Sequence, residues 1–247
     1  MTDEEAPSPG GGRVVLVTGG SRGIGAACVS WFVAHGDRVA FTSRVTGAGE
    51  REDGALALRC DVTRPDQVEA AFAAIEAHFG PVEVLVANAG ITRDTLIARM
   101  SEEAWGEVID TNLTGAYRVA KRAIAKMLRL HRGRVIFISS VGAFVGLPGQ
   151  ANYAASKAGM VGMARALARE VASRSITVNV VAPGLVATDM IEALGTERIE
   201  LMKNLVPLGR TATPDEIADA VGFLASAGAN YITGAVLPVD GGMGMGL

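Results

Sequence analysis

Residues 14–25 read VVLVTGGSRGIG, an apolar run followed at once by a glycine-rich turn. Its first four residues are apolar and mostly β-branched, which is typical of a buried strand. The glycines that follow permit a tight turn, close approach of the backbone to a pyrophosphate and close packing of the next helix on the sheet. The amides at the start of that helix would then face the anion. The residues predicted to contact a dinucleotide in this turn are Gly19, Ser21, Arg22, Gly23, Ile24 and Gly25.

The rest of the chain alternates short Val/Ile-rich runs with longer amphipathic stretches, which indicates repeated βαβ units around a buried parallel sheet. The predicted strands are 13–18, 38–42, 55–60, 82–87, 133–139, 177–182 and 235–239. The predicted helices are 23–35, 65–79, 102–130, 151–172 and 214–224. Right-handed crossovers then give an α/β fold: a single-domain, Rossmann-type, doubly wound parallel sheet of about seven strands with helices on both faces.

The domain is expected to span residues 13–247, because no shift in composition marks a second one. Residues 1–12 are acidic and rich in Pro and Gly, so we expect a flexible tail there. The least patterned stretch, 185–208, follows the carboxyl end of a predicted strand, where a lid over a ligand is expected. The tail has neither the basic nor the apolar region of a signal peptide, and no run is as long as a membrane span. A cytoplasmic protein that does not bind membranes is therefore expected.

The bulk composition excludes several other classes of function. The formal net charge of −3 argues against nucleic acid as the main partner. Cys28 and Cys60 are expected to be small buried hydrophobic residues. The three histidines stand apart from one another in the sequence and from both cysteines, so no metal site is expected.

The second predicted strand bears on the choice of nicotinamide cofactor. An NAD enzyme normally has Asp or Glu at its end, where the carboxylate accepts hydrogen bonds from the adenosine ribose. Here residues 41–44 read FTSR, and no acid follows until Glu50. Arg44 and Arg22 are suited to charge-assisted hydrogen bonds with a 2′-phosphate. Arg44 alone fits a solvated surface arginine as well, so the missing acid carries the argument that the cofactor is NADPH, released as NADP.

Tyr153 and Lys157 are four residues apart in a predicted helix, so their side chains lie on one face. A cation near a phenol lowers the phenol's pKa, which would make Tyr153 a proton donor near neutral pH. Ser140 ends the preceding strand at the sheet edge where open α/β folds bind ligands, and its hydroxyl can hydrogen-bond a carbonyl. Ser139 is an alternative for that role. Asn112 is polar within a helical pattern, which also fits a local backbone hydrogen bond.

Taken in order, these motifs resemble the short-chain dehydrogenase/reductase family over nearly the whole chain. The turn at 18–25, the sequence NAG at 88–90, and the four residues Asn112, Ser140, Tyr153 and Lys157 carry the resemblance. It implies that Tyr153 donates the proton and Ser140 orients the carbonyl. It also implies that Lys157 binds the nicotinamide ribose while tuning Tyr153, and that Asn112 supports a water in a proton relay. The further cofactor contacts that it implies are Asp61, Val62, Asn88, Ala89, Gly90, Pro183, Gly184 and Thr188.

More narrowly, several segments resemble the bacterial 3-oxoacyl-[acyl-carrier-protein] reductases, the keto-reducing enzymes of type II fatty-acid synthesis. These segments are 89–94 (AGITRD), 149–159 (GQANYAASKAG), 179–184 and 239–243, and the ending GMGMG at 242–246 looks most like reductases of high-GC bacteria. The resemblance implies a 3-oxoacyl thioester of acyl carrier protein as substrate. It also implies a homotetramer, with helices 102–130 and 151–172 in one interface and the C-terminal segment in another.

Two positions depart from the family pattern. Residue 87 is alanine where the family usually has a first asparagine, and His131 replaces an arginine associated with carrier docking. Arg129 and Arg132 flank His131, and Arg174 matches a second docking arginine. We expect these basic groups to meet at one rim and to guide an acidic carrier, although each also fits an ordinary solvated arginine.

Two alternatives remain at this point. The same chemistry would serve acetoacetyl-CoA, a polyketide or another small ketone. A protein of another class, a non-catalytic dinucleotide sensor, would use the fold to regulate a partner. The presence of both Tyr153 and Lys157 weighs against the sensor.

Overall fold

The computed structural model describes residues 11–45, 49–50, 54–192 and 195–245. Within these ranges one sheet has the strand order β3-β4-β2-β1-β5-β6-β7-β8. Neighbouring strands are parallel except for β3 and β4, which are antiparallel. The strands are β1 (Val14–Thr18), β2 (Arg38–Ser43), β3 (Gly49–Glu50), β4 (Leu56–Arg59), β5 (Val84–Ala87), β6 (Gly133–Ile138), β7 (Ile176–Pro183) and β8 (Val236–Val239).

The seven predicted strands are all present, and together they form the parallel part of the sheet. Their central members are buried on both faces, which is why they read as continuous apolar runs rather than as alternating ones. The additional strand, β3, is two residues long at the edge of the sheet. A two-residue strand has no periodicity by which the sequence would reveal it.

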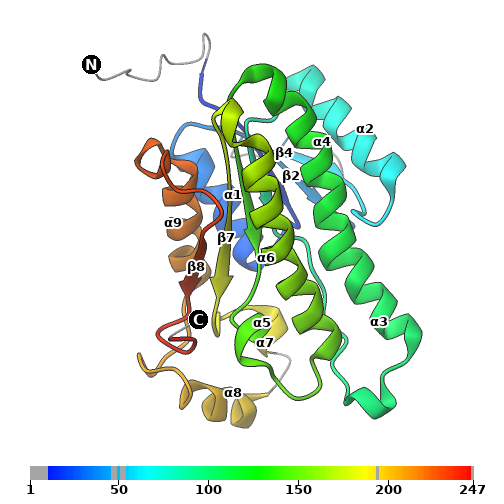
Figure 1. Cartoon of the computed structure of the whole chain (residues 1–247), viewed down its shortest axis with the longest axis vertical. Helices are drawn as coiled ribbons and strands as arrows, with labels where there is room; N and C mark the ends of the chain where they lie inside the picture. Colours follow the sequence, from blue (N-terminus) through cyan, green and yellow to red (C-terminus); the bar gives the residue numbers. More distant parts are fainter. Residues whose placement is uncertain (1–10, 46–48, 51–53, 193–194, 246–247) are drawn as a thin grey trace.

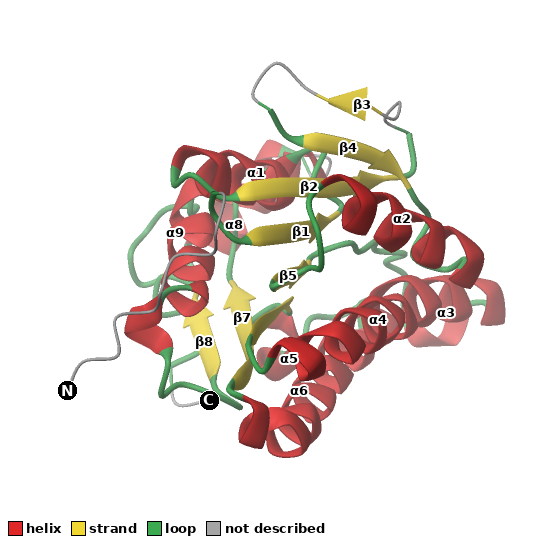
Figure 2. Ribbon diagram, turned by 90° about the horizontal axis from the view of Figure 1, so that it is seen from above, coloured by secondary structure: helices red, strands yellow, loops and turns green. Residues whose placement is uncertain are grey.

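Helices cover both faces of the sheet, as predicted (Figure 2). One core, between the sheet and helices α1 and α9, contains Phe32 and Val221. The other, under α2, α4 and α6, contains Phe72, Met127 and Met160. The α-helices are α1 (Gly23–Ala34), α2 (Pro65–His78), α3 (Glu102–Val108), α4 (Gly115–Leu130), α5 (Gly142–Val145), α6 (Ala151–Val171), α7 (Asp189–Glu192), α8 (Thr196–Lys203) and α9 (Pro214–Ala225).

The predicted helix 102–130 is helical throughout but not uniform. A π-helical segment, Ile109–Thr114, separates α3 from α4. The wider π turn changes the direction of the side chains that follow it, and Asn112 within it is completely buried. A polar residue at this position therefore has a partner inside the protein.

The order of the strands indicates at which edge of the sheet a ligand would bind. β1 lies between β2 and β5, so the chain winds outward in opposite directions from this point. Such a reversal opens a crevice at the carboxyl ends of the strands. The short helices α7 and α8, within the predicted lid stretch 185–208, lie at this same end of the molecule (Figure 1).

Of the predicted tail, residues 1–10 lie outside the described part of the chain. Cys28 and Cys60 are buried, as predicted, and burial raises their thiol pKa values to about 12 and about 11. None of the helices that the structure describes is long and apolar enough to cross a membrane.

Candidate active site

A cavity of about 730 Å³ opens at the carboxyl ends of the central strands. It brings together every predicted site residue except Asn112, which lies behind its wall. Those that line it are Gly19, Ser21, Arg22, Gly23, Ile24, Gly25, Arg44, Asp61, Val62, Asn88, Ala89, Gly90, Ser140, Tyr153, Lys157, Pro183, Gly184 and Thr188. Residues that are far apart in the sequence thus share one ligand-sized space.

The glycine-rich turn after β1 has the backbone that its sequence predicts. Gly19 and Gly23 have φ angles of +68° and +54°, which L side chains rarely adopt. A Cβ on Gly25 would lie 2.2 Å from the carbonyl oxygen of Gly19, so only glycine lets α1 start this close to the turn.

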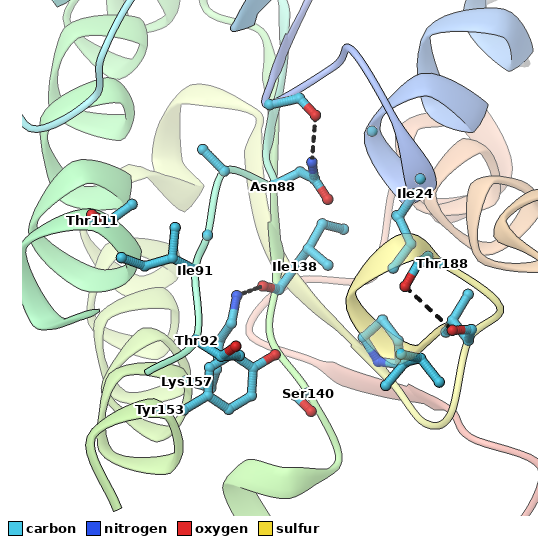
Figure 3. A pocket seen from close by; sticks show the side chains of 18 of the residues that line it. Ile24, Asn88, Ile91, Thr92, Thr111, Ile138, Ser140, Tyr153, Lys157 and Thr188 are labelled. Atoms are coloured by element: carbon cyan, nitrogen blue, oxygen red, sulfur yellow. Dashed lines mark hydrogen bonds between the residues drawn. The ribbon is translucent and has the colours of Figure 1, made fainter. Parts of the chain in front are cut away.

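The Asn88 side chain holds this turn by hydrogen bonds to its backbone (Figure 3). Its side-chain amide donates to the carbonyl oxygens of Thr18 and Gly19, at 3.0 and 3.1 Å. In return the Thr18 hydroxyl accepts from the backbone N–H groups of Asn88 and Ala89. Thr18, which the sequence argument did not select, therefore ties β1 to the segment after β5. Its position as the last residue of the strand, at the edge where ligands bind, could have indicated this role.

The start of α1 fits a phosphate group. The first amides of a helix have no partner within it. Here no side chain caps them, and the first turn contains no acidic residue. The glycines leave space for an anion to approach the backbone, and the helix dipole favours negative charge at this end.

Arg44 and Arg22 lie around the same end of the cavity. Arg44 is exposed at the end of β2, and within the described ranges it has no ion-pair partner. Arg22 is also exposed and lies 3.4 Å from a carboxylate oxygen of Asp189. The Asp61 carboxylate accepts from the backbone N–H and hydroxyl of Thr63, so it shapes the local turn.

Tyr153, Lys157 and Ser140 meet at the other end of the cavity (Figure 3). Tyr153 lies in the first turn of α6, and the Lys157 Nζ lies 5.6 Å from the centre of its ring. The Ser140 hydroxyl lies near the phenol and accepts from the backbone N–H of Gly142. Two hydroxyl groups and one ammonium thus face a common space.

Lys157 is 3% exposed, and its Nζ donates to the carbonyl oxygen of Ile138 at 2.7 Å. Burial lowers the pKa of Lys157 to about 8. Burial also raises the pKa of Tyr153, and the Asp94 carboxylate adds to that rise, while the neighbouring Ser140 hydroxyl opposes it. The expectation that the lysine lowers the pKa of Tyr153 is therefore wrong for this state of the protein. The cost of placing a phenolate in the interior exceeds the effect of an ammonium that is directed at Ile138.

Ser139 and Ser140 have separate partners. The Ser139 hydroxyl is buried and donates to the backbone carbonyl of Lys157 at 2.9 Å. Ser140 is the one that reaches the phenol. The geometry therefore favours Ser140 as the group that meets a substrate carbonyl.

Asn112 fixes the backbone rather than facing the cavity. Its Oδ1 accepts from the N–H of Ile91 at 2.8 Å, and its Nδ2 donates to the carbonyl oxygen of Ile91 and to the Ser156 hydroxyl, both at 3.0 Å. Both amide hydrogens are thus used inside the protein. The side chain holds the segment that follows Gly90.

The entrance near Tyr153 is built in part from the segments 89–94 and 149–159, which carry the family resemblance. Gln150 donates to the Asp94 carboxylate at 2.7 Å, and the N–H of Thr95 donates to the carbonyl of Gly149. These bonds join the segment after β5 to the segment before α6. Apolar residues continue the wall beyond them: Leu147, Pro148, Ile191, Met202 and Met243.

Three of the basic residues considered for guiding a carrier, His131, Arg132 and Arg174, lie at the opposite end of the chain from Tyr153. Arg174 contacts His131 at 2.7 Å, and Arg132 pairs with Glu83 at 2.9 Å. His131 and Arg174 follow the ends of α4 and α6, at the amino ends of β6 and β7 (Figure 1). From Tyr153 to the end of α6 is roughly 27 Å at the helical rise per residue. The two sites are apart within one chain because Tyr153 lies in the first turn of α6 and Arg174 follows its last residue.

The chain is similar in sequence to known reductases. The family described as enoyl-(acyl carrier protein) reductase matches residues 19–244. The 3-oxoacyl-[acyl-carrier-protein] reductase MabA of Mycobacterium tuberculosis is 52% identical over 98% of this chain and 97% of its own length. The 3-oxoacyl-[acyl-carrier-protein] reductase FabG of Escherichia coli is 46% identical over 95% of this chain and 98% of its own length.

The buried charge of Lys157 generates a prediction about stability. At pH 7 the lysine is protonated in the folded and the unfolded protein, and the folded state bears the cost of burial. As the pH rises from about 8 toward 10.5, the ordinary pKa of a lysine, the folded state loses this proton first, so the penalty for burying the charge shrinks and the protein becomes more stable. Lys157→Met should therefore stabilise the protein by about 1–3 kcal/mol at pH 7, and less near pH 10.

Denaturant unfolding at both pH values measures this difference. Lys121→Met, at an exposed position on α4, is the matched control and should show no such change with pH. A Lys157→Met variant that is less stable at pH 7, or whose advantage does not change with pH, would contradict the assignment.

Proposed function

The chain belongs to the short-chain dehydrogenase/reductase family, and we propose that it reduces 3-oxoacyl-[acyl-carrier-protein] to 3-hydroxyacyl-[acyl-carrier-protein] with NADPH in type II fatty-acid synthesis. One observation carries the proposal. The hydroxyls of Ser140 and Tyr153 converge beside Lys157 in a cavity whose other end is the glycine turn at the start of α1.

Two hydroxyl donors suit a ketone oxygen because that oxygen gains negative charge during reduction. Reductases of this family use a nicotinamide dinucleotide, which when bound supplies a hydride to the carbonyl carbon. Tyr153 transfers its phenolic proton to the oxygen, so ketone, hydride and proton together give the secondary alcohol. Ser140 holds the oxygen in place. Lys157 lies close enough to stabilise the phenolate that the transfer leaves behind.

The raised pKa of Tyr153 suits this direction of reaction. A phenol that stays protonated at neutral pH is ready to donate. As the pH rises through the phenol's pKa, the donor is lost and the rate of reduction should fall.

The substrate class follows from the relatives and from the entrance. Both named relatives carry 3-oxoacyl-[acyl-carrier-protein] in their names, and they match over almost their whole length. The apolar wall beyond Tyr153, which includes Leu147, Ile191 and Met202, offers a surface for an acyl chain. A carrier substrate delivers such a chain from outside the pocket.

The choice of NADPH over NADH rests on residues at the end of β2. No acid is present at that position, and Arg44 lines the cavity there with its guanidinium exposed. The other proposed cofactor contacts are those that line the same space, from the glycine turn to Thr188.

We also propose that residues 13–247 form one domain that assembles as a cytoplasmic homotetramer. The outer face of α4 supports an interface, because Tyr117 and Leu128 are exposed on it. Large apolar side chains on a helix surface are commonly covered in an assembly.

The proposed function is tested by comparing substrates. With NADPH, turnover of a 3-oxoacyl thioester of acyl carrier protein should exceed that of acetoacetyl-CoA in kcat/KM. A preference for the CoA ester or for a small ketone would assign the chain to another ketoreductase. Turnover of an enoyl thioester without turnover of the 3-oxo compound would replace ketone reduction by double-bond reduction.

The role of Tyr153 is tested by Tyr153→Phe, which keeps the ring and removes the proton. The rate of reduction should fall by about a hundredfold or more, while NADPH binding remains. Tyr117→Phe, at an exposed tyrosine on α4, is the matched control and should keep its activity. Near-normal turnover by Tyr153→Phe would rule out the phenol as proton donor.

Cofactor choice is tested by Arg44→Asp. The new carboxylate should repel a 2′-phosphate and accept from ribose hydroxyls, so the NADPH-to-NADH ratio of kcat/KM should fall by about tenfold or more. Arg64→Asp, at an exposed arginine paired with Asp66, is the control. An unchanged ratio in Arg44→Asp would mean that another group, with Arg22 the first to test, holds the phosphate.

A further inference from the structure

Ser156 lies between the two catalytic positions of α6 and is completely buried. Its hydroxyl donates to the backbone carbonyl of Tyr153 at 2.7 Å. The same oxygen accepts from the Nδ2 of Asn112 at 3.0 Å. The side chain therefore contacts no substrate but joins two of the residues on which the proposed reaction depends.

Asn112 extends the connection to a third segment. Besides Ser156, it binds both the N–H and the carbonyl oxygen of Ile91. The preceding residue, Gly90, packs closely against this group: a Cβ there would lie 3.2 Å from the Asn112 Oδ1 and 3.5 Å from the Lys157 Nζ. The end of β5, the π segment and the catalytic helix are thus joined by one buried set of hydrogen bonds.

Every donor in this set has an acceptor. The two amide hydrogens of Asn112 go to Ile91 and Ser156, and the hydroxyl hydrogen of Ser156 goes to Tyr153. Removal of the Ser156 oxygen would leave one Asn112 hydrogen without an acceptor in the interior, which is costly. The amide would then move to recover a partner, and its hold on Ile91 would weaken.

We propose that Ser156 is a positioning residue that couples the Tyr153–Lys157 helix to Asn112 and, through Asn112, to the Gly90–Ile91 wall of the cavity. The expected effect on turnover rests on the proposed function. The coupling itself does not, because its hydrogen bonds are present in the protein without ligands. The Gly90–Ile91 wall and the proton donor face the same space. A change in their relative position should therefore affect the chemical step more than substrate binding.

Ser139 provides a matched control. It is another buried serine, and it also donates to a backbone carbonyl of α6, that of Lys157 at 2.9 Å. It makes no hydrogen bond to Asn112 among the described residues. Ser156→Ala and Ser139→Ala therefore both remove one buried hydroxyl contact to the same helix, but only the first breaks the connection to Ile91.

The first readout is hydrogen exchange of the Ile91 amide in the protein without ligands. Ser156→Ala should speed this exchange by about tenfold, because the amide is held by Asn112. Ser139→Ala should leave it unchanged. This measurement decides the coupling whether or not the proposed substrate is turned over.

The second readout is steady-state kinetics with a 3-oxoacyl thioester and NADPH. Ser156→Ala should lower kcat by about tenfold or more with little change in KM, whereas Ser139→Ala should stay within about threefold of the unchanged enzyme. Asn112→Ala and the double variant complete a cycle. If Ser156 acts through Asn112, adding Ser156→Ala to Asn112→Ala should cost little more in kcat.

The proposal is overturned by unchanged Ile91 exchange, by an unchanged kcat, or by fully additive effects of the two substitutions. Failure of the proposed function looks different, because the unchanged protein would then not turn over the thioester while the exchange result still held. Should Ser156→Ala not fold, Ser156→Cys keeps the volume with a weaker acceptor and should give smaller changes in both readouts.

Discussion

The ammonium of Lys157 donates to the carbonyl oxygen of Ile138 inside the protein, and the active end of the molecule is arranged around that bond. Bringing a cation into the interior costs free energy, so its surroundings must be fixed. The bond ties α6 to the end of β6. Tyr153, one turn earlier on α6, is thereby held next to Ser140.

Burying the charge of Lys157 lowers the stability of the folded protein, and the proposed reaction uses that charge. An apolar residue would fill the position of Lys157 at lower cost, but in the proposed reaction it could neither stabilise a phenolate nor bind a ribose. The same interior raises the pKa of Tyr153 and keeps it a donor. Burial therefore acts on the two groups in opposite directions: it weakens the hold of the lysine on its proton and strengthens that of the tyrosine.

Much of this was predictable from the sequence because it depends on local pattern. Continuous apolar runs marked the parallel strands, and the glycine spacing after β1 marked a turn that tolerates no Cβ. Contacts between segments that are far apart in the sequence could not be predicted in this way. No local pattern shows that Asn112 lies in a π turn and holds Ile91, or that Asn88 supports the turn after β1. Arg174 was expected near the catalytic residues, but α6 is long, and Arg174 follows its last residue while Tyr153 lies in its first turn.

In the proposed reaction the hydroxyls of Tyr153 and Ser140 hold the oxygen that is reduced. A structure of the protein with NADP and a 3-hydroxyacyl thioester is the decisive measurement. We expect the 3-hydroxyl oxygen within hydrogen-bond distance, about 3 Å, of both hydroxyls, with the nicotinamide ribose against Lys157. A thioester bound with that oxygen directed away from Tyr153, or a nicotinamide ring at the Arg44 end of the cavity, would contradict it.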